Sequence, residues 1–204
     1  MSHSKQAIRA SMKEFLAGVS VTDRHKRSLD ACTLLASTKE FKAAQIIMLF
    51  LSMQQEVETA TLAVKAWQEG KSIAAPRVDW QGRRMEPVEI KSLDVGLKET
   101  QFGVREPIAG TQVALGMIDI VVIPGLAFDR RGYRVGRGRG FYDRFLSQQD
   151  FKGLRIGLCF HEQLLGEAIP TEEHDIPMDV VITDREIVRC PAPRPAGAGG
   201  RRTR

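Results

Sequence analysis

The sequence predicts an α/β fold, a three-layer domain in which a mostly parallel central sheet is flanked by helices. Two apolar runs, residues 46–51 and 118–123, show no alternation between apolar and polar positions. Such runs are typical of strands buried on both faces, as the strands of parallel sheets are. Segments between the predicted strands repeat their apolar residues at helical spacing. Strands that alternate with helices indicate a layered α/β domain.

The first predicted helix covers residues 4–17. Its apolar side chains recur on one face, and they are Ile8, Met12, Phe15 and Leu16. Lys5, Arg9 and Lys13 step by four along a neighbouring face, so they form a basic stripe.

Two further helices are predicted before the middle of the chain. Residues 22–37 form the first of these, with Thr22 as the N-cap. Residues 59–70 form the other, with Gly70 as the C-cap. The residues expected to face inward from it are Ala60, Ala63, Val64 and Trp67.

The remaining strands are expected over residues 72–75, 154–159, 179–183 and 186–189. Pro76 should stop the first of them, because proline cannot donate to a strand ladder. A hairpin is expected around residues 80–84, with loops after it. A short helix should begin near Gly140 and run through Phe145.

Residues 1–190 are expected to form a single domain. Residues 191–204 are rich in Pro, Gly, Ala and Arg, a composition that cannot build a core, so we expect this tail to be disordered. The tail holds four of the arginines behind the net charge of +5, which leaves about +1 on the rest of the chain. No specific binding of nucleic acid is therefore expected of the folded part.

The cysteine pattern and the apolar runs point to the cytoplasm. The three cysteines are Cys32, Cys159 and Cys190, an odd and sparse set that argues against a disulfide framework. No secretory signal is visible at the amino terminus. The apolar runs are too short to cross a bilayer, so no membrane partner is expected.

Glycine alternates with arginine in the segment Gly136-Arg-Gly-Arg-Gly140. The spacing is not the Gly-x-Gly-x-x-Gly of a dinucleotide-binding turn, and the chain contains no Gly-Lys-Ser/Thr of a Walker A loop. An RNA-binding Gly/Arg tract would be disordered and repetitive, whereas this segment lies between a predicted strand and a predicted helix.

A phosphate cradle is the interpretation that the chemistry favours. Glycines let backbone N–H groups approach an anion, and a helix that starts just after Gly140 would point free N–H groups at it. Arg134, Arg137 and Arg139 can add charge-assisted hydrogen bonds.

Asp143 follows the glycines within the first turn of the predicted helix. Beside a polyphosphate, a carboxylate is suited to bind Mg²⁺. It could equally complement the helix dipole or pair with Arg139 or Arg144. Spacing alone leaves both possibilities open.

Residues 124–144, Pro-Gly-Leu-Ala-Phe-Asp-Arg-Arg-Gly-Tyr-Arg-Val-Gly-Arg-Gly-Arg-Gly-Phe-Tyr-Asp-Arg, closely resemble the signature of the 5-formyltetrahydrofolate cyclo-ligase (methenyltetrahydrofolate synthetase) family. The resemblance extends to about Arg189. The other matching segments are residues 5–9, 51–59, 75–77, 103–107 and 173–179. Several matches in the right order are far more specific than one glycine run.

The resemblance implies a reaction that needs ATP and Mg²⁺. The formyl group of 5-formyltetrahydrofolate would be phosphorylated by ATP, and ring closure would give 5,10-methenyltetrahydrofolate, ADP and phosphate. We expect a monomer whose partners are ATP and 5-formyltetrahydrofolate.

The resemblance also implies roles for individual residues. Those expected to contact ATP are Lys5, Arg9, Arg134, Val135, Gly136, Arg137, Gly138, Arg139, Gly140, Phe141 and Tyr142. Those expected to contact the folate are Leu51, Glu56 and Phe141, and those expected to bind Mg²⁺ are Asp143 and Asp175. Without the resemblance, Lys5 and Arg9 would be taken as a solvated basic face and Glu56 as a loop acid.

Two positions depart from the family's usual pattern. Phe141 stands where a tyrosine is usual, so it can stack on a pterin but cannot donate a hydrogen bond. Arg139 stands where a lysine or glycine is common.

Other functions were weighed against this one. One is an ATP-dependent phosphotransferase that acts on another small acid, and another is a non-catalytic relative that binds folate or RNA through the basic tail. Cys159 and His161 are close enough in sequence to suggest zinc, but no second ligand pair accompanies them, which favours a core strand end.

Overall fold

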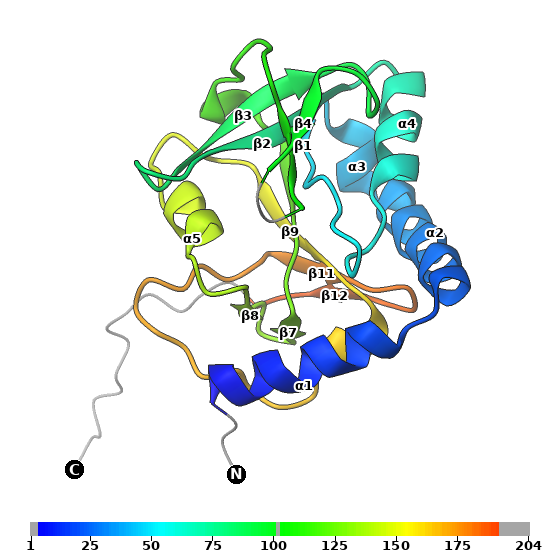
Figure 1. Ribbon diagram of the computed structural model, residues 1–204, viewed down its shortest axis with the longest axis vertical. Helices are drawn as coiled ribbons and strands as arrows, with labels where there is room; N and C mark the ends of the chain where they lie inside the picture. The colour runs from blue at the N-terminus through cyan, green and yellow to red at the C-terminus, as the bar shows by residue number, and fades with distance from the viewer. Residues whose placement is uncertain (1–3, 101–102, 192–204) are drawn as a thin grey trace, which may run out of the picture.

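The computed structural model describes residues 4–100 and 103–191. A seven-stranded sheet forms its centre, in the order β12-β11-β9-β6-β1-β2-β3 (Figure 1). The strands are β1 (Ile46–Met48), β2 (Ser72–Asp79), β3 (Arg84–Ile90), β6 (Ile120–Ile123), β9 (Leu154–Leu158), β11 (Val180–Ile182) and β12 (Ile187–Arg189). Only the edge strands β3 and β12 run antiparallel to their neighbours. The predicted mostly parallel sheet is therefore confirmed.

The helices lie on both sides of this sheet. They are α1 (Lys5–Gly18), α2 (Val21–Ser37), α3 (Lys39–Ala43), α4 (Ala60–Gln68) and α5 (Phe141–Leu146). Figure 1 shows α2, α3 and α4 on one side of the strands and α5 on the other. Short 3₁₀ turns occur at Leu115–Met117 and His161–Gln163.

Two small sheets accompany the central one. β4 (Leu97–Glu99) pairs with β5 (Arg105–Pro107). β7 (Ala127–Asp129) lies between β8 (Arg134–Val135) and β10 (Leu164–Leu165). α1 lies across the end of the molecule at which β7 and β8 are found (Figure 1).

Alternate residues of each central strand serve opposite faces. In β6, Ile120 and Val122 pack with the side of α2 and α4, whereas Val121 and Ile123 pack with Phe145 of α5 on the other side. All four strand residues are buried. This two-sided burial explains why the run lacks an alternating pattern.

Two predicted details of the helices are wrong. Ser20, not Thr22, caps α2, since its hydroxyl accepts a hydrogen bond from the Asp23 N–H at 3.1 Å. In α4 the buried residues are Leu62, Ala63 and Ala66, and the predicted Ala60 and Val64 are exposed. The helix offers two overlapping apolar stripes, and the one that holds the large Leu62 faces the core.

Pro76 does not end β2, which continues to Asp79. Pro76 lies opposite Pro87 in the antiparallel ladder with β3. Opposed residues of such a ladder either exchange two hydrogen bonds or exchange none, so two prolines suit the second kind of pair. The pairing of β2 with β1 ends at Ala74, so no neighbouring strand needs the missing N–H of Pro76.

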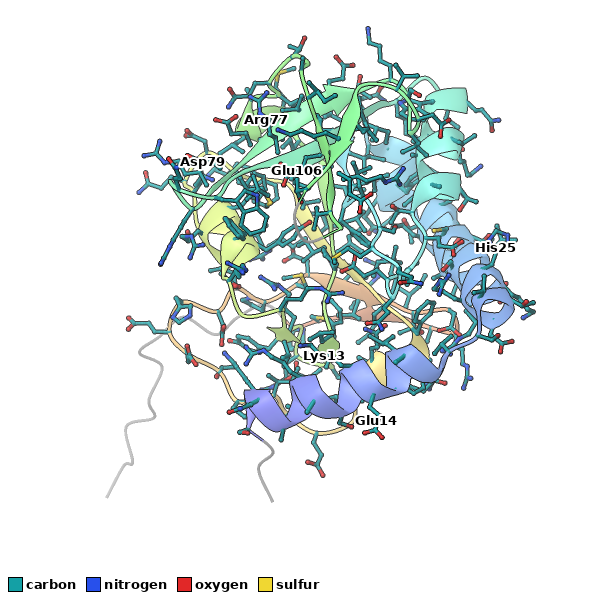
Figure 2. The ribbon with its side chains drawn as sticks, viewed as in Figure 1. Lys13, Glu14, His25, Arg77, Asp79 and Glu106 are labelled. Atoms are coloured by element: carbon teal, nitrogen blue, oxygen red, sulfur yellow. The ribbon has the colours of Figure 1, made fainter. Side chains whose placement is uncertain are left out.

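The predicted hairpin around residues 80–84 is confirmed as the connection between β2 and β3. Asp79 shapes it, because its Oδ1 accepts hydrogen bonds from the N–H groups of Gln81 and Gly82 at 3.1 and 2.9 Å. Figure 2 shows Asp79 at the tip of the hairpin.

The cysteines are free thiols. Cys159 is 1% exposed at the end of β9, as the core interpretation predicted. Burial raises the pKa of Cys32 to about 11, which keeps this thiol protonated. Among the residues described, no helix has the length and apolar character to span a membrane. Apart from Pro191, the predicted tail lies outside the described residues.

An ion pair between Arg27 of α2 and Asp184, in the turn between β11 and β12, should make stability depend on pH. Asp184 accepts hydrogen bonds from Arg27 Nε at 2.9 Å and from the His161 N–H at 2.7 Å. Burial works to raise the pKa of Asp184, but these bonds outweigh it and lower the pKa. A carboxyl with a lowered pKa in the folded state stabilises above its unfolded pKa, and that stability is lost as pH falls through the folded value.

We therefore expect Asp184→Asn to lower the free energy of unfolding by about 2 kcal/mol at neutral pH. The difference in unfolding free energy between the variant and the wild type should shrink below about pH 4, where the carboxyl of the unfolded wild type begins to take up a proton. Urea unfolding across this pH range measures it, with the exposed Asp150→Asn as the control. A difference that stays constant with pH would contradict the assignment.

Candidate functional site

One cavity of about 570 Å³ opens at the carboxyl ends of the parallel strands. Its walls come from the segments after β1 and β6, from the end of β2, from the start of α1, from the Gly/Arg loop and from residues 172–175. Parallel sheets place ligands at this edge. All the predicted site residues line this cavity except Val135, which is fully buried with Ile8 and Ala127 beneath α1.

The Gly/Arg loop joins β8 to α5, and the β7–β8 hairpin separates it from the central strand β6. Gly138 and Gly140 have φ values of +96° and +65°, a conformation that other residues rarely adopt. α5 has only six residues, so its dipole adds little. An anion in the loop would depend mainly on the glycine N–H groups and the arginines.

The basic stripe of α1 divides where the cavity ends. Lys5 and Arg9 line the cavity and are half-buried, whereas Lys13, about one turn further on, is exposed. Arg9 Nε donates to the carbonyl oxygen of Gly136 at 3.0 Å, so α1 is joined directly to the loop. Lys5 and Arg9 are thus not the solvated face that the stripe alone suggested.

Lys5 also binds Asp175, with 2.6 Å between Nζ and Oδ2. The same Oδ2 accepts the Glu172 N–H at 2.7 Å. Burial works to raise the pKa of Asp175, but the bonds from Lys5 and Glu172 outweigh it and hold the pKa below its ordinary value. The carboxyl is therefore ionised at neutral pH.

Asp143 faces a buried arginine. Its Oδ1 lies 2.9 Å from Nη2 of Arg134 and accepts a long hydrogen bond, 3.4 Å, from the Ile176 N–H. The Arg134 guanidinium also lies 5.6 Å from the ring centre of Tyr142. Burial raises the pKa of Tyr142, so its hydroxyl stays protonated.

An aromatic wall closes another side of the cavity. The rings of Trp80 and Phe141 meet edge to face, with centres 5.2 Å apart. Arg139 lies over Trp80 at 5.3 Å, and Arg144 lies over Phe141 at 5.3 Å. Sequence reasoning missed Trp80 as a site residue. A large aromatic side chain in a hairpin turn, where small polar residues are usual, was the available signal.

Glu56 and Leu51 lie on the segment that follows β1. Glu56 Oε1 is 3.3 Å from Arg137 Nη2, and its Oε2 accepts the Met53 N–H at 3.0 Å. Glu56 therefore joins this segment to the Gly/Arg loop. Leu51 is nearly buried and adds apolar surface beside it.

The donor set fits a metal that is shared with a ligand. Asp143 and Asp175 both line the cavity, and no group of three or more His, Cys, Asp or Glu side chains suited to a metal occurs in residues 4–100 and 103–191. Mg²⁺ commonly binds one or two carboxylates and completes its shell with water and phosphate oxygens. Asp143 and Asp175, which line the same cavity as the Gly/Arg loop, match this preference.

The fold and the cavity define an α/β protein whose cavity, at the carboxyl ends of its parallel strands, has a lining suited to small anionic ligands. The chain belongs to the 5-formyltetrahydrofolate cyclo-ligase family, an enzyme family of folate metabolism, because the family's model matches residues 1–184. The resemblance in the sequence is thereby confirmed.

Known relatives agree with this assignment. The mouse 5-formyltetrahydrofolate cyclo-ligase is 32% identical over 189 residues, which cover 88% of this chain and 93% of the mouse protein. The Haemophilus influenzae protein of that name is 29% identical over 182 residues, covering 87% of this chain and 97% of its own. The NMR structure of the Aquifex aeolicus 5,10-methenyltetrahydrofolate synthetase superposes with a TM-score of 0.80 at 30% identity, covering 93% of this chain and 94% of that one.

Proposed function

We propose that this protein catalyses the ATP- and Mg²⁺-dependent cyclisation of 5-formyltetrahydrofolate to 5,10-methenyltetrahydrofolate, with release of ADP and phosphate. One observation carries the proposal beyond family membership. A single cavity is lined by basic side chains and a glycine loop suited to phosphates, by two carboxylates suited to a metal, and by Glu56 and an aromatic wall suited to a pterin.

The chemistry explains why a phosphate site is needed. The N5-formyl group is an amide, so its carbon is a poor electrophile and its oxygen a poor leaving group. The formyl oxygen attacks the γ-phosphorus, the bond to ADP breaks, and an iminium phosphate results. N10 then attacks the formyl carbon and loses its proton, and phosphate leaves. The protein contributes mainly position and charge.

Lys5, Arg9 and the arginines of the loop would neutralise the phosphate oxygens, and the N–H groups of residues 136–140 would hold them. Asp143 and Asp175 would hold Mg²⁺, which when bound supplies positive charge to the transferring phosphoryl group. The residues at the folate end would be Leu51, Glu56 and Phe141, where the Glu56 carboxylate suits the N–H donors of a pterin and Phe141 offers a stacking face.

The free thiols support the reducing cytoplasm as the compartment of the protein.

The direct test mixes the purified protein with Mg²⁺, ATP and 5-formyltetrahydrofolate and follows the near-ultraviolet absorbance of the methenyl product. We expect product only when ATP is present, and an absence of ATP-dependent product would overturn the proposal. ATP turnover without folate would instead indicate a phosphotransferase. RNA binding that weakens with salt and disappears on deletion of residues 191–204 would indicate the RNA-binding relative.

A further inference from the structure

Two ion pairs occupy the part of the cavity where metal and phosphate are proposed to meet. Lys5 lies 2.6 Å from Asp175, and Arg134 lies 2.9 Å from Asp143. In each pair, the cation is a proposed phosphate ligand and the carboxylate is a proposed metal ligand. The groups proposed to bind the two ligands are therefore paired with each other in the structure.

The pair of Arg134 and Asp143 is a contact of charges without complete hydrogen bonding. The Arg134 side chain is only 7% exposed. Within the described residues, its buried Nε and Nη2 atoms make no hydrogen bond, although Nη2 lies close to the Asp143 carboxylate. A buried donor without an acceptor is unfavourable, so these two N–H groups would gain from an anionic oxygen that enters the cavity. Arg9, in contrast, already donates to a carbonyl oxygen.

The charges around the cavity nearly cancel. Its basic side chains are Lys5, Arg9, Arg134, Arg137 and Arg139, and its acidic side chains are Glu56, Asp143, Glu172 and Asp175. A polyphosphate alone would meet the two carboxylates at close range, and a divalent metal alone would meet the two cations. Each ligand is therefore opposed by the charges that the other would neutralise.

We propose that these two pairs exchange partners when the metal and the nucleotide bind. The phosphate oxygens take Lys5 and Arg134, and the metal takes Asp175 and Asp143, so that the two ligands bind as a unit and each alone binds weakly. This inference rests on the proposed function, because it assigns the four side chains the ligands proposed there. The exchange makes the coupling between nucleotide and metal a property of these particular side chains.

Calorimetric titration of two variants tests the exchange without measuring turnover. In EDTA, Asp175→Asn should bind a non-hydrolysable ATP analogue about tenfold more tightly than the wild type, because the opposing carboxylate is gone and Lys5 is released. Lys5→Met should bind Mg²⁺ alone about tenfold more tightly and the analogue more weakly. Both variants should lose most of the coupling between metal and analogue.

Lys13→Met is the matched control, since Lys13 is exposed on the same helix and should leave every affinity unchanged. If Asp175→Asn binds the analogue in EDTA no more tightly than the wild type does, the exchange is overturned. If that variant does not fold, the metal-only affinity of Lys5→Met decides, and no increase would overturn it. Coupling that neither substitution alters overturns the exchange while leaving the proposed function intact. A wild type with no affinity for the analogue even in the presence of Mg²⁺ overturns both.

Discussion

Asp143→Asn is expected to lower kcat of the proposed cyclisation by at least about 100-fold. Asparagine keeps the shape and one oxygen of the side chain but removes the charge that a metal requires. The free energy of unfolding should fall by less than about 2 kcal/mol, because the contact with Arg134 lacks complete hydrogen bonds and contributes less than an ideal buried pair. Steady-state kinetics and urea unfolding of the same preparation measure the two effects.

Asp150→Asn serves as the control, because Asp150 lies just beyond α5 and is exposed. It should change neither the rate nor the stability. If Asp143→Asn lost stability in proportion to its activity, Asp143 would serve the fold, either as the partner of Arg134 or at the start of α5. Catalysis would then need another explanation.

Gly132→Ala is expected to destabilise the protein by about 4 kcal/mol. Gly132 has a φ of +91°, and a Cβ at this position would lie 2.3 Å from the backbone oxygen of Met178. The glycine cannot move away easily, since its N–H donates to Asp129 O at 2.9 Å and its carbonyl accepts the Met178 N–H at 2.8 Å. Two backbone segments would have to separate.

Thermal and urea unfolding measure this effect, and the midpoint temperature should fall by about 10 °C. Gly166→Ala is the control, because a Cβ there meets nothing within 4 Å, and it should leave stability nearly unchanged. A Gly132→Ala variant as stable as Gly166→Ala would show that the turn before β8 tolerates a side chain.

The central strands could be predicted because two-sided burial leaves a clear mark on the sequence. β1 and β6 appear as apolar runs, and the β2–β3 hairpin appears as a polar interruption. The inward face of α4 could not be settled in this way, since two stripes overlap and only tertiary packing chooses between them. The continuation of β2 through Pro76 could not be predicted either, because it depends on the neighbouring strand. β1 pairs with β2 only as far as Ala74, so no strand on that side needs the N–H that Pro76 lacks.

Only part of the candidate site could likewise be predicted from the sequence. Local spacing indicated the Gly/Arg loop and Asp143, and the resemblance supplied Lys5, Glu56 and Asp175. The pairs between these groups join residues far apart in the chain, and spacing carries no information about them. Val135 shows that a sequence motif can also include a residue that takes no part in the site. It is fully buried and faces away from the cavity.

The contact of α1 with the Gly/Arg loop has a consequence for the order of folding. Arg9 meets a residue 127 positions later and Lys5 one 170 positions later, although both belong to the first helix. Contacts between distant residues form late, since a long loop must close first. During synthesis, α1 leaves the ribosome well before the residues that it contacts, so it cannot dock until they have also been made. A partly synthesised chain thus has no assembled cavity, and release of α1 would be an early step of unfolding that removes the site before the central sheet is lost.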